Sequence, residues 1–328
     1  MVSIITPTHY KPKLFNITVE SVMQQTCGDF EWVVLDNSPE HYFTKDFSIF
    51  MENHPEYGDV CGNVKIFEMP HSDEARPVGY YKNICASLTT CGNDDFILVL
   101  DHDDLITRTT VEDIVKCDEK YKGLLDYMTG FAICLIYDSE KNVFQLKNNF
   151  NADLTVRMSC IEPITIGSDF KLPIEHFQFP QYVNLDYKYL VAALNSHPRA
   201  IKKRLLNINV FKFHENSMFE EDTPQVYLAS LFFNIGWIAR PTVCYILYKE
   251  GEEYKNSCIH KVFDLQSHID NETLKKAMAL IYEGVRNIVG DNTINKMFLY
   301  DDFAFSGTLN PSSEWLDTIN NLKESCFR

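Results

Sequence analysis

The sequence predicts an α/β protein with an open, mostly parallel sheet that is flanked by helices. Apolar, strand-like segments alternate with segments of helical spacing up to about residue 140, and strands that are separated by helices pair in parallel with helices on both faces. The chain has 328 residues, of which 45% are hydrophobic and 23% are charged. It is therefore long enough for one large domain or two ordinary ones, with an ample core.

The first half contains four expected strands and three expected helices. The strands are at residues 2–6, 31–35, 64–67 and 96–100, and the helices are at residues 13–25, 80–88 and 109–121. The first strand is rich in β-branched residues, and acidic Glu112 and Asp113 suit the start of the third helix. The strands end at Pro7, Asp36, Met69 and Asp101, so we expect these ends to line one crevice.

From residue 124 the pattern changes. We expect a strand pair at 128–137 and 143–146 around a turn at 138–142, followed by loops and short strands at 147–185. A partly helical stretch at 190–206 is expected to break near Pro198. A helix at 223–234, a strand at 243–248 and a mostly helical tail from about 263 complete the expected elements. We therefore expect one unit over residues 1–240, with halves at 1–123 and 124–240, and a mainly helical C-terminal extension over 241–328.

Composition narrows the class of protein. The formal net charge of -16 disfavours a general attraction to nucleic acid or anionic membranes, although it does not exclude a local basic patch. Ten cysteines without a C-x-x-C pair argue against a structural zinc site and suggest buried free thiols in a reducing cytosol. No targeting signal is visible, and the longest apolar stretch, residues 228–239, is far shorter than the ~20 residues that span a bilayer. We expect a cytoplasmic protein without a transmembrane segment.

The most informative motif is Asp101-His102-Asp103-Asp104, directly after the apolar run 96–100. Clustered carboxylates repel one another, so they usually persist because a cation occupies the site. In open α/β sheets ligands bind at the carboxyl ends of strands, where these residues are expected. The alternative is an acidic turn that only solubilises a loop, and for the motif alone the two interpretations carry equal weight.

Together with its surroundings, this motif resembles that of the inverting family 2 glycosyltransferases, members of the nucleotide-diphospho-sugar transferase superfamily with the GT-A fold. The similar segments, in order, are Val2-Ser3-Ile4-Ile5-Thr6-Pro7-Thr8, Trp32-Val33-Val34-Leu35-Asp36-Asn37-Ser38, Gly79 with Lys82 and Asn83, Leu100-Asp101-His102-Asp103-Asp104, His197-Pro198-Arg199 and Glu220-Glu221-Asp222. The resemblance covers about residues 1–240, with 1–123 as the nucleotide-sugar-binding half and 124–240 as the acceptor-side half. It implies sugar transfer from a nucleoside-diphosphate sugar, and we expect a UDP-sugar.

The resemblance also implies roles for single residues. A divalent cation, Mn²⁺ or Mg²⁺, would neutralise the charge of the departing diphosphate. Asp103 is the first choice of ligand for this cation. Asp101 would hold the ribose or the sugar, or bind the metal itself, and Asp104 would support either role. The nucleotide would be walled by Thr6, Pro7 and Thr8, and its base would donate to Asp36. Lys82 would offset phosphate charge, with Arg76 and Asn83 as alternatives. His260 would complete the metal shell.

Inversion requires a base that removes the proton of the acceptor hydroxyl. Asp222, at the start of the expected helix 223–234, is the first choice, and Glu221 is the second. The alternative for this acidic run is capping of the helix, which its dipole favours by about 0.3–1 kcal/mol per charge. Two histidines lie near the expected site. We expect His102 to be a spacer in the motif, and His9 either touches the nucleotide or is an ordinary loop histidine.

One stretch runs against the overall acidity, because no acidic residue lies between Asp186 and Glu215. Its positive residues are Lys188, Arg199, Lys202, Lys203, Arg204 and Lys212. They either pair with acids elsewhere or form an anion-binding surface on the acceptor side, with His197, Arg199, Lys202 and Lys203 as candidates. The acceptor is then a saccharide or, alternatively, a hydroxymethylated base of phage DNA.

Two features qualify the resemblance. The turn Asn37-Ser38-Pro39-Glu40 lacks the family's usual glycine, which alters the expected base pocket, and no Gln-x-x-Arg-Trp motif follows Asp222. Transfer of a single sugar is therefore favoured over polymer synthesis. A non-catalytic nucleotide-sugar-binding protein is the alternative from another class, and nucleotidyl transfer is disfavoured because residues 6–10 lack a Gly-rich, basic phosphate loop.

Overall fold

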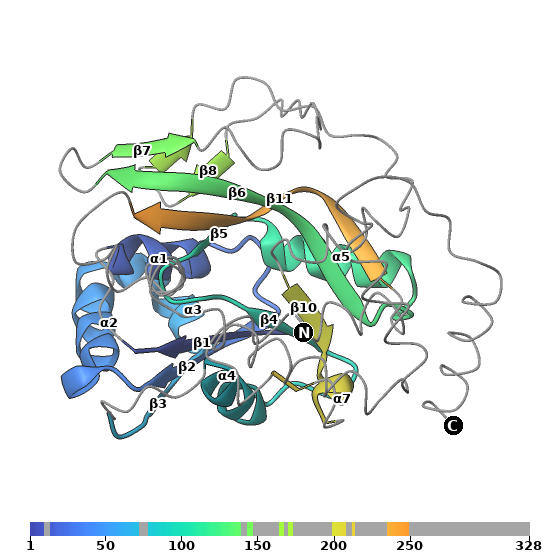
Figure 1. Ribbon diagram of the computed structural model, residues 1–328, viewed down its shortest axis with the longest axis horizontal. Helices are drawn as coiled ribbons and strands as arrows, with labels where there is room; N and C mark the ends of the chain where they lie inside the picture. Colours follow the sequence, from blue (N-terminus) through green and yellow to red (C-terminus); the bar gives the residue numbers. More distant parts are fainter. Residues whose placement is uncertain are drawn as a thin grey trace, which may run out of the picture.

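The protein is built on one large sheet with helices around it (Figure 1). The computed structural model describes residues 1–9, 14–71, 78–138, 143–146, 164–166, 170–172, 199–207, 212–213 and 235–248. The strands are β1 (Val2–Thr8), β2 (Phe30–Asp36), β3 (Val64–Glu68), β4 (Phe96–Val99), β5 (Leu105–Ile106), β6 (Tyr127–Asp138), β7 (Val143–Leu146), β8 (Ile164–Ile166), β9 (Phe170–Leu172), β10 (Arg199–Lys202) and β11 (Ile235–Tyr248). The helices are α1 (Phe15–Met23), α2 (Tyr42–Asn53), α3 (Gly58–Cys61), α4 (Val78–Ser87), α5 (Thr110–Lys120) and α7 (Lys203–Leu206), with 3-10 turns η1 (Pro39–His41) and η2 (Pro55–Tyr57).

In the described part of the chain, the strands of the large sheet follow the order β3-β2-β1-β4-β10-β6-β11-β5, with β7 paired to β6. The first four of these strands are mutually parallel, as predicted. The order reverses at β1, because β2 and β3 extend to one side of it and β4 lies on the other. Beyond β4, strand β10 is antiparallel to both of its neighbours, whereas β6 and β11 run parallel. The predicted class, an α/β protein with a mostly parallel sheet, is confirmed.

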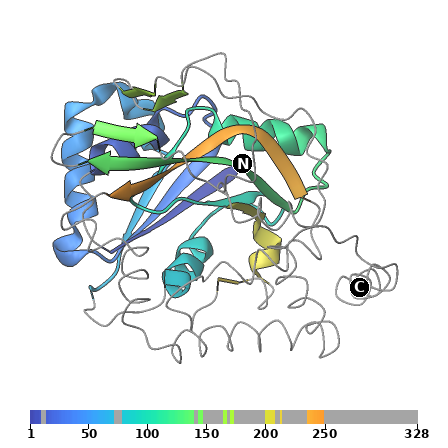
Figure 2. The same ribbon diagram turned by 45° about the horizontal axis from the view of Figure 1, so that its top comes forward.

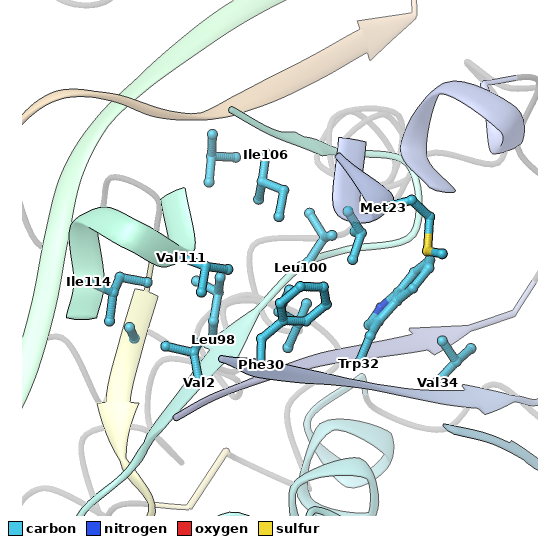
Figure 3. Close-up of a cluster of buried hydrophobic side chains, with 14 of the residues drawn as sticks. Val2, Met23, Phe30, Trp32, Val34, Leu98, Leu100, Ile106, Val111 and Ile114 are labelled. Carbon is cyan, nitrogen blue, oxygen red and sulfur yellow. The ribbon is translucent and has the colours of Figure 1, made fainter. Parts of the chain in front are cut away.

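The core lies on both faces of the parallel strands, and the helices surround them in two views (Figures 1 and 2). On one face α1, α2 and α5 contribute to a single apolar cluster with the strands, and Figure 3 shows Val2, Trp32, Leu98 and Val111 meeting there. The indole of Trp32 is fully buried, and its Nε1 donates to Thr6 Oγ1 at 3.0 Å. On the opposite face α4 packs against β1 and β2. β1, β2 and β4 therefore bury both of their faces, as expected for parallel strands, whereas β3 is only partly buried.

The prediction of a partly helical stretch at 190–206 is wrong for residues 199–202, which form β10. This strand lies between β4 and β6, and its Ala200 and Ile201 pair with Leu98 and Ile97. Two apolar residues between two charged ones are too short a pattern to identify a strand, and only the neighbouring strands complete it. A short helix, α7, follows directly.

The predicted division at residue 240 falls inside β11. The strand was expected at 243–248, but it begins at Ile235 and continues through Pro241, where its pairing with β6 is irregular. A proline lacks the N–H that a regular ladder needs, so an irregular pairing accommodates it. The sheet thus extends to Tyr248.

The other predicted helices and strands are either confirmed or lie outside the described residues, and some observed elements were not predicted. The predicted strand pair at 128–137 and 143–146 is confirmed as β6 and β7, and the helices near 13–25, 80–88 and 109–121 are confirmed with ends one or more residues shorter or shifted. The sequence analysis missed α2 and β5. The helix expected at 223–234 and the helical tail lie outside the described residues.

Two findings bear on the predictions from composition. Six of the described cysteines are free thiols: Cys85, Cys91 and Cys244 are buried, as predicted, and Cys27, Cys61 and Cys117 are partly exposed. Among the described helices, none combines the length and the apolar character that a membrane crossing requires.

Candidate functional site

The carboxyl ends of the parallel strands lie at one edge of the sheet. Thr8 at the end of β1 is level with Asp36 at the end of β2, and Asp36 is level with Glu68 at the end of β3. On the other side of β1, the N–H of Leu100 after β4 donates to the carbonyl of Ile5 at 3.0 Å. The strand order reverses between β1 and β4, the position at which open α/β sheets bind ligands.

The acidic loop Asp101–Asp104 follows β4 at this edge. The N–H of Asp104 donates to the carbonyl of Asp101 at 3.0 Å, which closes the loop into a tight turn. Asp101, His102 and Asp103 are partly exposed, whereas Asp104 is 2% exposed. The structure therefore brings the predicted carboxylates of this motif together at the predicted edge.

Asp104 ties the acidic loop to β11. Its Oδ1 accepts a hydrogen bond of 3.0 Å from the N–H of Ile246, and its buried Oδ2 has no hydrogen-bond partner within the described part of the chain. Burial, followed by the negative charges of Asp103 and Asp101, raises the pKa of Asp104 well above its usual value. The nearby Arg199 opposes this effect more weakly. Asp104 therefore holds its proton more tightly than an exposed carboxyl does.

The acidic loop fits a hard divalent cation whose coordination shell is completed by other oxygen donors. Carboxylates are suitable ligands, their mutual repulsion is relieved by a cation, and Asp104 has a buried oxygen without a partner in the described chain. Within the same described residues, no group of three or more His, Cys, Asp or Glu side chains is arranged to hold a metal ion. Magnesium-type sites commonly use one or two carboxylates together with phosphates and water, so the protein need not supply a complete shell.

Lys82 on α4 is the counter-charge of Asp101. Its ammonium is 3.0 Å from Asp101 Oδ1, and the side chain is only 1% exposed. The neighbouring Asn83 binds the backbone of Phe213, donating to its carbonyl at 2.8 Å and accepting from its N–H at 3.0 Å. The Phe213 ring, with its centroid 6.0 Å from the ammonium, covers Lys82. Lys82 is therefore placed to orient Asp101, not to reach freely into solvent.

The carboxylate of Asp36 is hydrogen-bonded within the protein, mainly by the residues that follow β2. The carboxylate is 0% exposed and accepts five hydrogen bonds, from Thr8 Oγ1 (3.2 Å), from the N–H and hydroxyl of Ser38, and from the N–H and hydroxyl of Thr44 (3.0 and 2.9 Å). Burial alone would raise its pKa, but the hydrogen bonds from Ser38 and Thr44 outweigh it and lower the pKa of Asp36. In this structure Asp36 fixes the start of α2, and the predicted contact with a base is not accessible to it.

The first-strand residues have similar internal roles. Thr6 and Thr8 are buried, with their hydroxyls bonded to Trp32 and Asp36, respectively. Pro7 between them is partly exposed. Of the three residues that were predicted to wall a nucleotide, only Pro7 presents a side chain to the outside.

Tyr42 and His71 at this edge were not predicted as parts of the site, and Asn37 and Ser38 were predicted only as parts of the turn beside the expected base pocket. Asn37 and His71 follow β2 and β3, Tyr42 begins α2, and Ser38 bonds Asp36. Burial, followed by the charges of Asp36 and Asp103, raises the pKa of Tyr42, so its phenol lies in the field of both carboxylates. The signal that points to Asn37 is its position directly after a predicted strand, whereas His71 comes three residues after the end of β3.

Three described residues of the basic stretch, Lys202, Lys203 and Arg204, are paired within the protein. Lys202 is 1% exposed, with its ammonium 2.9 Å from Asp118 and 4.0 Å from the centre of the Phe96 ring. Lys203 donates to the carbonyls of Thr89 (2.8 Å) and Cys91 (3.1 Å). The prediction that Lys202 and Lys203 face an acceptor is therefore wrong, because both ammonium groups are held by partners in the chain.

Arg204, the next positive residue, is paired too. Its guanidinium binds Asp94 and, at 2.6 Å, Asp126. The interpretation that the stretch pairs with acids elsewhere holds for Lys202 and Arg204, whereas Lys203 is held by backbone carbonyls. Arg199, in contrast, lies close enough to the acidic loop to lower the pKa of Asp104.

Several predicted site residues lie outside the described residues. They are Arg76, His197, Glu221, Asp222 and His260. Their assignments stay predictions.

The fold is shared with crystal structures of TarS from S. aureus. TarS residues 1–349 in complex with UDP-GlcNAc match with a TM-score of 0.57 at 17% identity, covering 98% of this chain and 80% of that chain. A second TarS structure matches with a TM-score of 0.55 at 17% identity, and this chain covers 48% of its length. TarS 1–349 in complex with UDP has a TM-score of 0.51 at 15% identity, covering 99% of this chain and 91% of that one. At these identities the likeness establishes the fold.

No family model matches the sequence, and no curated protein matches it either.

Proposed function

We propose that this protein is a metal-dependent, inverting glycosyltransferase that moves one sugar from a UDP-sugar to an acceptor hydroxyl. The observation that carries the proposal is the acidic loop Asp101–Asp104, which follows β4 where the strand order reverses. The same fold in TarS binds UDP-GlcNAc and UDP. A nucleoside-diphosphate sugar brings the phosphate oxygens that the incomplete carboxylate set lacks.

The residues of the acidic loop have separate tasks. Asp103 and Asp101 hold the divalent cation, Mn²⁺ or Mg²⁺, with Asp104 as the buried support that fixes the loop to Ile246. When bound, the cation supplies Lewis-acid neutralisation of the charge that builds up on the leaving diphosphate. Lys82 keeps the Asp101 carboxylate in place through their ion pair, and its own charge adds to the stabilisation of the phosphates at short range.

Inversion needs a proton acceptor on the acceptor side of the sugar. We assign this role to Asp222, with Glu221 as the alternative, since the sequence places both directly before a segment of helical spacing. A positioned general base typically contributes about 10²–10⁴-fold to the rate.

The acceptor that fits best is a saccharide. Binding to a DNA backbone requires several lysine or arginine side chains that are available to phosphates. Lys202, Lys203 and Arg204 are paired within the chain, which removes half of the basic stretch from such a surface. The net charge of -16 adds to the repulsion of a polyanion.

The test is release of UDP from a panel of UDP-sugars, with and without Mn²⁺ and a saccharide acceptor. We expect turnover that requires the metal, stops with a chelator and falls at least about 100-fold in Asp103→Asn. Asp59→Asn, which changes an exposed acid on α3, is the matched control and should keep normal turnover. Turnover that is unchanged by the chelator and by Asp103→Asn would overturn the proposal, and NMR of the product anomer decides between inversion and retention.

A further inference from the structure

Asn83 on α4 binds the backbone of one distant residue, Phe213, through both ends of its amide. Its Nδ2 donates to the carbonyl of Phe213 at 2.8 Å, and its Oδ1 accepts from the N–H of Phe213 at 3.0 Å. The two residues are 130 positions apart in the chain. Only one orientation of the amide satisfies both groups, so this pair of bonds, the Asn83–Phe213 clamp, fixes where the Phe213 backbone lies on α4.

The residue before Asn83 is Lys82, and the face of α4 that carries it lies on the sheet. Cys85, one turn further along this face, donates its thiol to the carbonyl of Val33 in β2 at 3.2 Å. The Lys82 side chain is buried, and its ammonium ends 3.0 Å from Asp101 Oδ1 in the acidic loop. Lys82 therefore crosses from α4 to the edge at which β4 ends.

The buried ring of Phe213 lies over the same ammonium, with its centroid 6.0 Å from Lys82 Nζ. This distance is at the outer limit of a cation–π interaction, so the attraction between ring and charge is small. A buried ring also excludes water, and an ion pair from which water is excluded is stronger than one in solvent. The clamp thus places an apolar cover over the ion pair of Lys82 and Asp101.

The cover comes from a different part of the chain than the charges that it covers. Phe213 comes after α7, which contacts α4 on one side of the sheet (Figures 1 and 2). Lys82 belongs to α4, and Asp101 follows β4. The fold therefore brings three segments together at one ion pair, and Asn83 is the side chain that holds the third segment there.

We propose that Asn83 and Phe213 are positioning residues for the metal–diphosphate part of the donor, because the clamp keeps water away from Lys82 and thereby holds Asp101 in place. The inference rests on the proposed function, which places a cation and a diphosphate at the acidic loop. A carboxylate that is already oriented loses less conformational freedom when it binds a cation. An ammonium that is shielded from water also acts more strongly on nearby phosphate charge than a hydrated one.

The experiment is isothermal titration calorimetry of UDP into the full chain in the presence of Mn²⁺. Phe213→Ala should bind UDP about tenfold more weakly than the wild type, because water then reaches the ion pair that orients Asp101. Asn83→Ala should have a similar effect, since it removes both bonds to Phe213, while alanine preserves the helix. Phe213→Leu should bind within about twofold of the wild type, because leucine excludes water without an aromatic ring.

Two further variants separate this role from a general loss of structure. Phe50→Ala removes an equal aromatic ring from the core on α2 and is the matched control, which should keep the UDP affinity of the wild type. Lys82→Met lacks the ammonium, so adding Phe213→Ala to it should weaken UDP binding by no more than about twofold. Circular dichroism checks that each variant is folded.

The outcomes separate the inference from the proposed function. Folded Phe213→Ala and Asn83→Ala variants that bind UDP as tightly as the wild type overturn the inference and leave the proposed function standing. The same holds if Phe213→Leu binds as weakly as Phe213→Ala, or if Phe213→Ala costs as much affinity in the Lys82→Met background as in the wild type. A wild type that does not bind UDP with Mn²⁺ overturns both.

Discussion

The ammonium of Lys82 and the carboxylate of Asp101 form an ion pair of 3.0 Å between α4 and the acidic loop. The pair is asymmetric, since Lys82 is 1% exposed and Asp101 is 29% exposed. A buried ammonium without a counter-charge is costly, so Asp101 has a structural duty besides any role in binding.

We therefore expect different stabilities for two neighbouring charge removals. Asp101→Asn leaves the Lys82 ammonium buried without its anion and should lower the free energy of unfolding by about 2–3 kcal/mol. Asp103→Asn removes a negative charge that repels Asp104, so its stability should equal or exceed that of the wild type. Chemical denaturation in the absence of metal measures both, and equal destabilisation by the two variants would contradict the assignment.

A second prediction concerns Glu31 on β2, which is a buried structural anion. Its carboxylate accepts hydrogen bonds from Ser3 (2.5 Å), from Lys65 (2.5 Å), from Thr90 and from the N–H of Cys91 (3.0 Å). Burial alone would raise its pKa, but these partners, led by Lys65, lower the pKa of Glu31 from 4.5 to about 2.

A lowered carboxyl pKa stabilises the fold above the unfolded value, and this stabilisation is lost as the pH falls. The contribution of Glu31, about 3 kcal/mol, should be complete above pH 4.5 and should disappear progressively toward pH 2. Glu31→Gln should flatten this part of the stability curve and lower the free energy of unfolding at pH 7. Glu52→Gln, an exposed change on α2, is the control. If the free energy of unfolding of Glu31→Gln depends on pH in the same way as that of the wild type, the prediction is wrong.

The third prediction tests the packing of β11. A Cβ at Gly236 would lie 2.6 Å from Leu125 Cδ1 and 3.2 Å from Cys117 Sγ, so Gly236→Ala forces the neighbours apart. Overpacking of this kind typically costs about 1–3 kcal/mol, which should appear as a lower Tm. Gly62→Ala introduces a methyl group with nothing within 4 Å and should leave Tm nearly unchanged. Equal Tm values for the two variants would refute this account of the strand.

The last prediction separates the two candidates for the catalytic base. Asp222→Ala should lower kcat about 10²–10⁴-fold with little effect on UDP binding, because the base acts on the acceptor hydroxyl and not on the donor. Glu221→Ala should retain most of the activity. Steady-state kinetics with a saccharide acceptor decides, and normal turnover in both variants would remove the assignment.

Local patterns predicted the parallel half of the sheet well. β2 and β4 are short, nearly continuous apolar runs that stop at an aspartate or an acidic loop, whereas β1 continues through Pro7 to Thr8. Because the carboxyl ends of parallel strands share one edge, predicting these runs also placed Asp36 and Asp101 on that edge. The helix α2 was missed because its apolar side chains, Phe43, Phe47 and Phe50, follow a turn that resembles a loop in sequence.

The roles of charged residues required the tertiary structure. Lys202 looks like a surface lysine in sequence, yet it lies in the sheet beside Phe96 and Asp118, each more than 80 positions away. Asp36 looks like a ligand-binding carboxylate, yet Thr8, Ser38 and Thr44 use both of its oxygens.

Local sequence patterns were enough to predict the parallel strands β1 to β4, the edge at which they end and the acidic loop at that edge, because apolar runs and their terminators are local properties. Only the tertiary structure shows which partner each charged side chain has. It therefore also shows whether that side chain can contact a ligand or is bonded within the protein. The physical reason is that the free energy of a charge depends on burial and on neighbours that the chain brings together from distant positions.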